Sequence, residues 1–552
     1  MSDKHEYIFE LFAPYNNQAN LIADFNDWQE TPMEKSDDGY FRAKVNLEDG
    51  IYHYRFNIQT KSWFYPEDEW KTVTDPYATE IDGDTQNAIL RLKNGTKIVD
   101  EYEWRHNDAP LDENNKIVIY EMHVGDFSGG ENDPFERGRY TDATAKLNYL
   151  NELGINAVEL MPVKESPGDF SWGYSPVHFF ATETGYGASF ELKEFIDRSH
   201  AHGIRVIADG VYNHANTDTP LAQIDHDYWF RHDPLDAENN WGPEFNYDFY
   251  DENLDVMPAR KFILDSIRFW IREYEIDGIR YDGARHFGGY DILRVFVETA
   301  RESAAGKPFV NIAEHIPQTP EIVAPQGAMD GCWNDTFMHS VAGYLSGDAP
   351  DFERLKDAID AKRLGYAEVV SVVNYICNHD QNRLLKRLGE KGIFGEEAFR
   401  RARLGAAILL TSVGIPMIWM GEEFGEYKEK STESNKINWS LLEHTENKNL
   451  FEYYKNLIIL RKTNTGLQTA NISFFHEDAE KCVLAYRRFD ENETGAVVVL
   501  NLSDERLENY TVENFPSGEN WHEWTKNFDV EISENKLTTA LEKREALIFV
   551  NS

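Results

Sequence analysis

Cysteine is scarce in this chain. The three that occur, Cys332, Cys377 and Cys482, are widely spaced and odd in number. Such spacing argues against a disulfide framework and against a paired-cysteine metal motif, and it is typical of a reducing compartment. The first residues, MSDKHE, also lack the basic and apolar stretches of a secretory signal. The sequence therefore predicts a cytoplasmic protein.

Long apolar runs and an excess of positive charge are missing as well. No apolar run approaches the roughly 18 residues that a membrane helix needs. Lysine and arginine number 55 against 97 aspartates and glutamates, which gives a net charge of −42. Such a field repels nucleic-acid phosphates and anionic membranes, so we expect neither as a partner. A neutral substrate fits better, and the aromatic content of 13% suits sugars, which stack on aromatic rings.

Both ends of the chain have β-type patterns. Residues 1–105 contain short alternating apolar runs with turn residues between them, which predicts an N-terminal β-sandwich. Residues 466–552 predict a second, C-terminal β-sandwich in the same way. Trp28, Trp63 and Trp70 are candidates for a sugar-stacking platform on the first sandwich. Packing of these rings against the next domain is the alternative interpretation.

The middle part, residues 106–465, alternates short apolar runs with helical segments. Eight such runs predict the α/β class and a (β/α)8 TIM barrel with parallel strands buried on both sides. The expected strands are 117–122, 157–161, 205–208, 278–281, 309–313, 328–333, 369–376 and 416–420. Residues 214–258 exceed an ordinary connection between strand and helix, so we expect an inserted subdomain there.

The fourth expected strand ends in the stretch GIRYDGARH, residues 278–286. Arg280 and Asp282 are two residues apart, so strand geometry places both side chains on one face. A guanidinium beside a carboxylate depresses the pKa of that carboxylate and keeps it ionised, as a carboxylate nucleophile requires. A structural ion pair at the end of a strand is the alternative interpretation.

Acidic residues also end three other expected strands. Asp209 follows the third strand, Glu314 the fifth and Asp380 the seventh. Function in such a barrel lies at the carboxyl ends of the strands, where these groups meet. A cluster of carboxylates costs stability unless chemistry requires it. Glycoside cleavage is such a chemistry, because one carboxylate attacks the anomeric carbon and another protonates the leaving oxygen.

Four motifs carry a resemblance to a known family. DGVYNH (209–214), GIRYDGARH (278–286), NIAEH (311–315) and NHDQNR (378–383) resemble the signature regions of the α-amylase superfamily of glycoside hydrolases. VELMPVKE and WGYSP, between residues 158 and 176, add to the match. The N-terminal part resembles the starch- and glycogen-binding β-sandwich of branching enzymes, debranching enzymes and malto-oligosyltrehalose trehalohydrolases.

The resemblance implies a role for each matching residue. Asp282 matches the nucleophile, Glu314 the general acid/base and Asp380 the third catalytic carboxylate. Matching residues that bind sugar or support the site are Arg280, His214, His379, Tyr174, Trp172, Asp209, Arg285 and His286. Retaining chemistry predicts the carboxyl groups of Asp282 and Glu314 about 5–5.5 Å apart. We also expect burial beside Asp282 to raise the pKa of Glu314.

The resemblance leaves the reaction open. Arg285 and His286 match a pair that contacts glucan on the leaving-group side in α-amylases and that branching enzymes usually lack. Hydrolysis of α-1,4-glucans, such as starch, glycogen and malto-oligosaccharides, is therefore the first expectation. Branching by transfer to a 6-hydroxyl and release of trehalose are the next, and an inactive glucan-binding protein is the alternative that is not an enzyme. No cofactor or metal is expected, although Asn213 matches a calcium ligand of secreted α-amylases.

Overall fold

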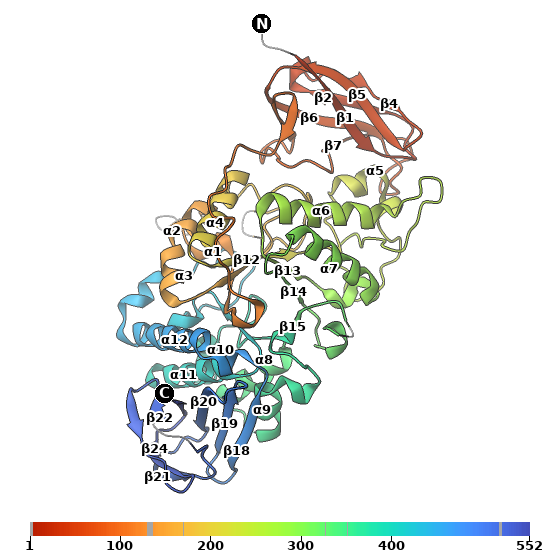
Figure 1. Cartoon of the computed structure of the whole chain (residues 1–552). Coiled ribbons are helices and arrows are strands. Elements are labelled where there is room, and N and C mark those ends of the chain that lie inside the picture. Colours follow the sequence, from red (N-terminus) through yellow and green to blue (C-terminus); the bar gives the residue numbers. More distant parts are fainter. Residues whose placement is uncertain are drawn as a thin grey trace.

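The computed structural model describes residues 4–129, 136–168, 171–325, 327–349, 351–517 and 521–551. Figure 1 shows three parts in a row, with small sheets at each end and a large helical part between them. Within the described residues, no helix combines the length and the apolar character needed to cross a membrane.

The N-terminal part consists of two antiparallel sheets that face each other. One has the strand order β1 (His5–Phe12), β5 (Tyr40–Leu47), β4 (Glu34–Lys35). The other has the order β3 (Thr31–Pro32), β2 (Ala19–Ala23), β6 (Gly50–Gln59), β8 (Ala88–Lys93), β9 (Thr96–Ile98), and β7 (Trp70–Val73) pairs with β6. Alternate side chains, such as Phe9, Leu21 and Phe56, fill the core between the sheets. We call residues 4–98 the N-terminal module.

The N-terminal module is attached to the middle part at α5 (Pro220–Trp229). This helix is broken at Asp225, whose φ of −160° and ψ of 96° are not helical. The carbonyl of Ile224 is therefore free to accept the backbone N–H of Lys61 at 2.9 Å. Trp63 donates its indole N–H to His226 Nδ1 at 3.0 Å.

The three tryptophans of the module that were candidates for a stacking platform are well exposed. Their exposed fractions are 43% for Trp28, 55% for Trp63 and 40% for Trp70. Trp63 contacts α5 through its ring edge and still leaves more than half of its surface in solvent. Packing against the middle part thus accounts for part of the position of Trp63, whose ring contacts His226 and His232, and the sugar-stacking platform stays a prediction.

The middle part is a closed barrel of eight parallel strands, β10 to β17 in order, with β17 pairing back to β10. The strands are β10 (Ile119–Met122), β11 (Ala157–Leu160), β12 (Arg205–Gly210), β13 (Gly278–Tyr281), β14 (Val310–Ala313), β15 (Gly331–Trp333), β16 (Val372–Asn374) and β17 (Ile415–Trp419). Every residue of these strands is buried. The predicted (β/α)8 fold is confirmed.

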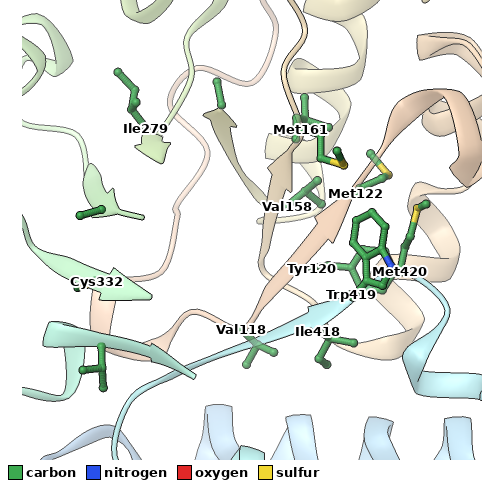
Figure 2. Close-up of a cluster of buried hydrophobic side chains, with 14 of the residues drawn as sticks. Val118, Tyr120, Met122, Val158, Met161, Ile279, Cys332, Ile418, Trp419 and Met420 are labelled. Carbon is green, nitrogen blue, oxygen red and sulfur yellow. The ribbon is translucent and has the colours of Figure 1, made fainter. Parts of the chain in front are cut away.

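Alternate residues of each barrel strand point to opposite sides of the wall. Ile119, Ala157 and Ile207 pack together in the interior, whereas Val118 and Tyr120 belong to the larger cluster that includes the surrounding helices. Figure 2 shows part of this outer cluster, with side chains from β10, β11 and β17. The barrel is therefore a packed core rather than a pore.

Helices surround the barrel (Figure 1). They are α1 (Val124–Phe127), α2 (Tyr140–Ala145), α3 (Leu147–Leu153), α4 (Ser189–Ala201), α6 (Pro258–Tyr274), α7 (Tyr290–Ala304), α8 (Asp335–Leu345), α9 (Phe352–Ile359), α10 (Leu384–Glu390), α11 (Gly395–Thr411) and α12 (Thr445–Thr463). The apolar stripe of α6 shows why they form. Ile263, Ile267, Trp270 and Tyr274 recur at intervals of three or four residues and are all buried.

The C-terminal part packs a sheet against the barrel helices. Its six strands are, in spatial order, β18 (Ile472–Asp478), β19 (Val483–Phe489), β20 (Gly495–Asn501), β25 (Glu545–Asn551), β22 (Trp521–Glu523) and β23 (Phe528–Val530). β21 (Leu507–Val512) pairs with β24 (Leu537–Leu541) in a second sheet. In β20, Val498 and Leu500 belong to the barrel-side cluster, and Val497 and Val499 belong to a separate C-terminal core. The predicted second sandwich is confirmed.

Two buried glutamates follow β17 and hold the barrel to its helices. Glu423 accepts hydrogen bonds from the hydroxyls of Tyr120, at 2.9 Å, and Tyr149, at 2.6 Å. Glu422 accepts one from the Tyr454 hydroxyl at 2.7 Å. Burial raises the pKa of each glutamate to about 7. Their partners lie on β10, α3 and α12, so this pair has a structural role.

We predict that Glu423→Gln weakens the dependence of thermal stability on pH. A carboxyl with an ordinary pKa of 4.5 that rises to about 7 on folding stabilises the folded state below its unfolded pKa. That stabilisation, roughly 3 kcal/mol, is lost as the pH rises through about 7. Glutamine resembles the protonated form, so the midpoint of thermal unfolding of the variant should fall less between about pH 5 and pH 8.

The exposed residue Glu443 supplies the control, because Glu443→Gln removes the same charge from the surface. Parallel stability curves for the wild-type and Glu423→Gln proteins would contradict the prediction.

Candidate active site

Ionisable side chains occupy one end of the barrel interior. The inward-facing positions Ile119, Ala157 and Ile207 are apolar, but two residues further along the same strands stand Glu121, Glu159 and Asp209. Because the period of a strand is two, these acids continue the inward-facing rows toward the carboxyl ends of the strands. Arg280 pairs in register with Asp209. The interior thus changes from apolar to charged along the barrel axis.

Arg280 is the centre of this charged end, and its side chain is fully buried. Its Nη1 donates hydrogen bonds to Asp209 Oδ2 at 2.6 Å and to Asp282 Oδ1 at 3.0 Å. Its Nη2 lies 2.8 Å from Glu314 Oε2 in an ion pair. The hydroxyl of Tyr174 lies 3.2 Å from Nη1 and donates to Asp209. One guanidinium therefore gathers carboxylates from the ends of β12, β13 and β14.

The pKa of Asp282 differs from the sequence-based expectation. Burial raises this pKa well above its usual range, Arg280 lowers it only in part, and the charges of Glu314 and Asp209 raise it further. The expected depressed pKa is wrong because burial disfavours the charged form of Asp282 and because three carboxylates share the single guanidinium. The cluster therefore favours keeping a proton among its carboxyl groups. The raised pKa expected for Glu314 stays a prediction.

His379 is held from below by Glu121, a residue that sequence reasoning missed. Glu121 Oε1 lies 2.6 Å from His379 Nδ1, and Oε2 accepts the backbone N–H of His379 at 3.2 Å. Burial lowers the pKa of His379, but its ion pair with Glu121 outweighs this and leaves the pKa raised. The ring stacks on Tyr174, with centroids 5.1 Å apart, and meets Trp172 edge to face at 5.3 Å.

Glu159 is a second acid that sequence reasoning missed. Burial raises its pKa well above the usual range, and the charge of Glu121 adds to the rise. Its Oε2 has no hydrogen-bond partner within the part of the chain that the structure describes. A carboxyl in this setting is neutral at ordinary pH. Both residues are lone acids inside otherwise apolar strands, at positions that face the barrel interior. That pattern is the sequence feature that could have identified them.

The charged end of the barrel opens into a pocket of about 370 Å³. We call it the active pocket. Its walls are Trp172, Tyr174, His214, Trp241, Asp282, Gly283, Arg285, His286, Glu314, Ile316, His379 and Asp380. The structure thus brings nine of the eleven predicted site residues to one cavity, and the other two, Asp209 and Arg280, lie beneath it. Trp241, from the inserted region, is 49% exposed and offers a further aromatic face.

Asp380 and the pair Arg285–His286 lie at the more open parts of the active pocket. The Asp380 side chain is 40% exposed, and its Oδ2 lies 3.5 Å from His379 Nε2. His286 meets the ring of Trp241 edge to face at 4.7 Å. Arg285 is exposed and reaches the carbonyl of Ile316 at 3.4 Å. The individual roles assigned to these residues stay predictions.

The side-chain polar atoms of His214 and Asn213 bond to other groups of the protein. His214 Nε2 donates to the carbonyl of Tyr174 at 2.8 Å, and burial lowers the pKa of His214 to about 4. Asn213 donates to the carbonyl of Asp282 at 3.2 Å, and its oxygen contacts His214. Calcium requires six to eight oxygen ligands, so these contacts do not fit a calcium site at Asn213. No cluster of three or more potential metal-ligating acids, histidines or cysteines occurs among the described residues.

Comparison with known protein families agrees with this geometry. Residues 112–445 match the family described as alpha amylase, catalytic domain. The chain belongs to the alpha-amylase family. Residues 1–78 match carbohydrate-binding module 48, the isoamylase N-terminal domain. The resemblance inferred from the motifs is confirmed, and the protein is an enzyme of the alpha-amylase family of glycoside hydrolases and transglycosylases.

Relatives of this alpha-amylase family member have several activities. Malto-oligosyltrehalose trehalohydrolase of Saccharolobus solfataricus is 28% identical over 77% of this chain and 74% of the relative. Pullulanase of Bacillus subtilis is 28% identical over 88% of this chain and 74% of its own length. The 1,4-alpha-glucan branching enzyme of Aquifex aeolicus is 27% identical over 95% and 87%.

Solved structures of the family share the fold of the whole chain. The crystal structure of pullulanase type I from Bacillus subtilis, complexed with maltose, has a TM-score of 0.83 at 22% identity and covers 100% of this chain and 85% of its own. A putative alpha amylase from Salmonella typhimurium has a TM-score of 0.77 at 20% identity, with coverage of 100% and 99%. At this identity the likeness concerns the fold alone.

We predict that Glu121→Gln lowers kcat/KM by roughly 10- to 100-fold and moves the alkaline limb of its pH profile to lower pH. The negative charge of Glu121 raises the pKa of His379, so its removal lets His379 lose its proton at lower pH. Glutamine keeps an acceptor for Nδ1, so the ring stays in place. The measurement is kcat/KM on a glucan substrate across pH.

Glu159→Gln is the matched control, since it makes the same change at the neighbouring buried carboxyl, which is already uncharged, and leaves the Glu121–His379 pair intact. An unchanged alkaline limb in Glu121→Gln would show that Glu121 is not a positioning residue for His379.

Proposed function

We propose that this enzyme hydrolyses α-1,4-linked glucans with retention of anomeric configuration. The observation that carries the proposal is the contact of Asp282 and Glu314 with two nitrogens of one guanidinium, Arg280, at the floor of an open pocket. Two carboxyl groups held this way are close neighbours, as retaining glycosidases require. We expect their separation to be about 5–5.5 Å, too short for a water molecule between them.

In the first step, Asp282 attacks the anomeric carbon and the glycosidic C–O bond breaks. Glu314 gives its proton to the leaving oxygen, which departs as a sugar hydroxyl. In the second step, Glu314 removes a proton from water as the water oxygen replaces Asp282 at the anomeric carbon. This cycle needs one proton on the pair at the start. The burial and mutual repulsion that raise the pKa of Asp282 disfavour loss of both protons and so support that state.

The rest of the active pocket suits a sugar ring. The faces of Tyr174 and Trp172 offer stacking surfaces, and Asp380 and His379 offer polar atoms for ring hydroxyls. An imidazolium at His379, favoured by Glu121, donates hydrogen bonds from both nitrogens. We assign Asp380 the binding of ring hydroxyls and stabilisation of the positive charge that develops at the anomeric carbon.

Water is the proposed acceptor because Arg285 and His286, which line the active pocket, match a pair that contacts linear glucan on the leaving-group side in α-amylases and that branching enzymes usually lack. Branching is the second candidate, favoured by the branching-enzyme relative that spans 95% of this chain. Release of trehalose is the third, favoured by the trehalohydrolase relative, which is 28% identical. These reactions differ only in the substrate and in whether water or a sugar hydroxyl reaches the glycosyl ester on Asp282.

We predict that Asp282→Asn and Glu314→Gln each reduce turnover of amylose by at least roughly 1,000-fold without lowering thermal stability. Asp282 is a buried carboxyl with a raised pKa, and asparagine has no charge to bury. The midpoint of thermal unfolding of Asp282→Asn at neutral pH should therefore stay equal or rise. In the wild type, protonation of Asp282 should place the acid limb of kcat/KM above the ordinary pKa of aspartate. Asp233→Asn, an exposed change in the inserted region, is the control and should keep turnover.

A product analysis decides between the candidate reactions. We expect incubation with amylose to create new reducing ends, counted by a reducing-sugar assay. Loss of iodine colour without new reducing ends, together with 1,6-linked signals in NMR, would replace hydrolysis with branching. Trehalose released from a trehalose-capped oligosaccharide, with amylose left intact, would favour the third candidate.

A further inference from the structure

A second cavity lies between the N-terminal module and the barrel. Its volume is about 330 Å³, close to the 370 Å³ of the active pocket. β6 and β7 of the module, the connection after β11 and helix α5 all contribute to its walls. We call it the junction pocket. We propose that the junction pocket binds a glucose unit of the same α-glucan that is cleaved in the active pocket, an inference that rests on the proposed function.

Arg55 supplies the strongest polar group of the junction pocket. Its Nη2 donates to the carbonyls of Thr85, at 2.8 Å, and Gln86, at 3.1 Å. Within the described residues, Arg55 forms no ion pair with a carboxylate, although it is half-buried and lies in a chain with a net charge of −42. Burial of this kind lowers the pKa of Arg55. A half-buried guanidinium held only by carbonyl groups has donors left for a neutral hydroxyl ligand.

His178 adds a second polar group on the opposite, barrel side. The residue is only 3% exposed, and its Nδ1 has no hydrogen-bond partner among the described residues. Burial, together with the charge of Arg55, lowers the pKa of His178 to about 3. The ring is therefore neutral, with one donor and one acceptor. An unsatisfied buried imidazole is costly unless a ligand or water completes its hydrogen bonds.

The remaining walls suit a sugar better than an anion. The exposed Asp218 lines the junction pocket with a carboxylate, which repels phosphate but accepts hydrogen bonds from hydroxyls. The carboxyl of Glu165 is already bonded to Thr184 and Gln86, and burial raises its pKa. The side-chain oxygens of Gln86 and Gln223 offer acceptors, while their amide nitrogens already donate to groups of the protein. Apolar surface for the C–H faces of a pyranose ring comes from Val73, Pro167, Val177 and Pro220. Mixed donors and acceptors around a modest apolar surface are what a neutral polyol requires.

The junction pocket also touches the segment that carries two residues of the active pocket. The carbonyl of Glu165 accepts the backbone N–H groups of Val177, at 2.9 Å, and His178, at 3.3 Å. These bonds join two points of the connection after β11, and Trp172 and Tyr174 of the active pocket lie between them in the chain. A glucan with one unit in the junction pocket would contact both the module and the base of this connection.

The test counts maltose sites on the full-length Asp282→Asn protein, which binds sugar without turning it over. We expect isothermal titration to give two sites. Arg55→Met should weaken one of them at least tenfold and leave the other unchanged. Thr72→Trp should abolish the same site, because Thr72 is exposed and lines the junction pocket. Arg91→Met is the matched control, since it breaks the pairing with Glu80 elsewhere in the module and should keep both sites.

A crystal of Asp282→Asn soaked in maltose should show sugar beside Arg55 and His178. A single site in the active pocket would overturn the inference, as would two sites that persist in both Arg55→Met and Thr72→Trp. A junction pocket that takes inorganic phosphate but no maltose would also overturn it. These outcomes are independent of the proposed function, which stands or falls on the turnover of amylose by the wild-type enzyme.

Discussion

The charge balance around Arg280 is the interaction on which the active site depends. A fully buried guanidinium needs acceptors for its hydrogen bonds, and carboxylates gathered this closely are stable only with a cation among them. Arg280 meets Asp209, Asp282 and Glu314 within 3.0 Å. One positive charge cannot neutralise three negative ones, so the cluster is biased toward holding a proton. A retaining glycosidase needs such a proton on its acid while its nucleophile is ionised.

The barrel makes this cluster possible by dividing its interior into two zones. Apolar residues such as Ile119 and Ile207 fill one end of the interior and stabilise the barrel. This stabilisation offsets the cost of burying charges at the other end. Two residues further along the strands, the same inward-facing rows carry Glu121 and Asp209. Helices and the C-terminal sheet pack around the barrel, and the buried pair Glu422–Glu423 links the barrel to its helices. The strand ends are therefore held at fixed spacing. The inserted region adds Trp241 to the mouth of the pocket.

Sequence reasoning reached the fold from local patterns, and it reached most of the pocket from the motifs that resemble the α-amylase superfamily. Asp282 and Glu314 each follow a short apolar run, and a parallel barrel brings such positions to one rim. It missed Glu121 and Glu159, because a lone acid in a four-residue strand does not reveal which side of the barrel wall it faces. The pKa of Asp282 was predicted in the wrong direction, since its burial was not counted and Arg280 was taken as the partner of one carboxylate. The junction pocket joins residues 55 to 223, and no local pattern connects them.

The central claim is that Asp282 is the nucleophile of a retaining reaction, and covalent trapping tests it most directly. A fluorinated glucosyl fluoride that forms a slowly hydrolysed glycosyl ester would be incubated with the wild-type enzyme. The labelled peptide would then be located by mass spectrometry. The account predicts one sugar adduct per chain, on the carboxyl group of Asp282, and none in Asp282→Asn. An adduct on another residue, or release of a product with inverted anomeric configuration, would contradict it.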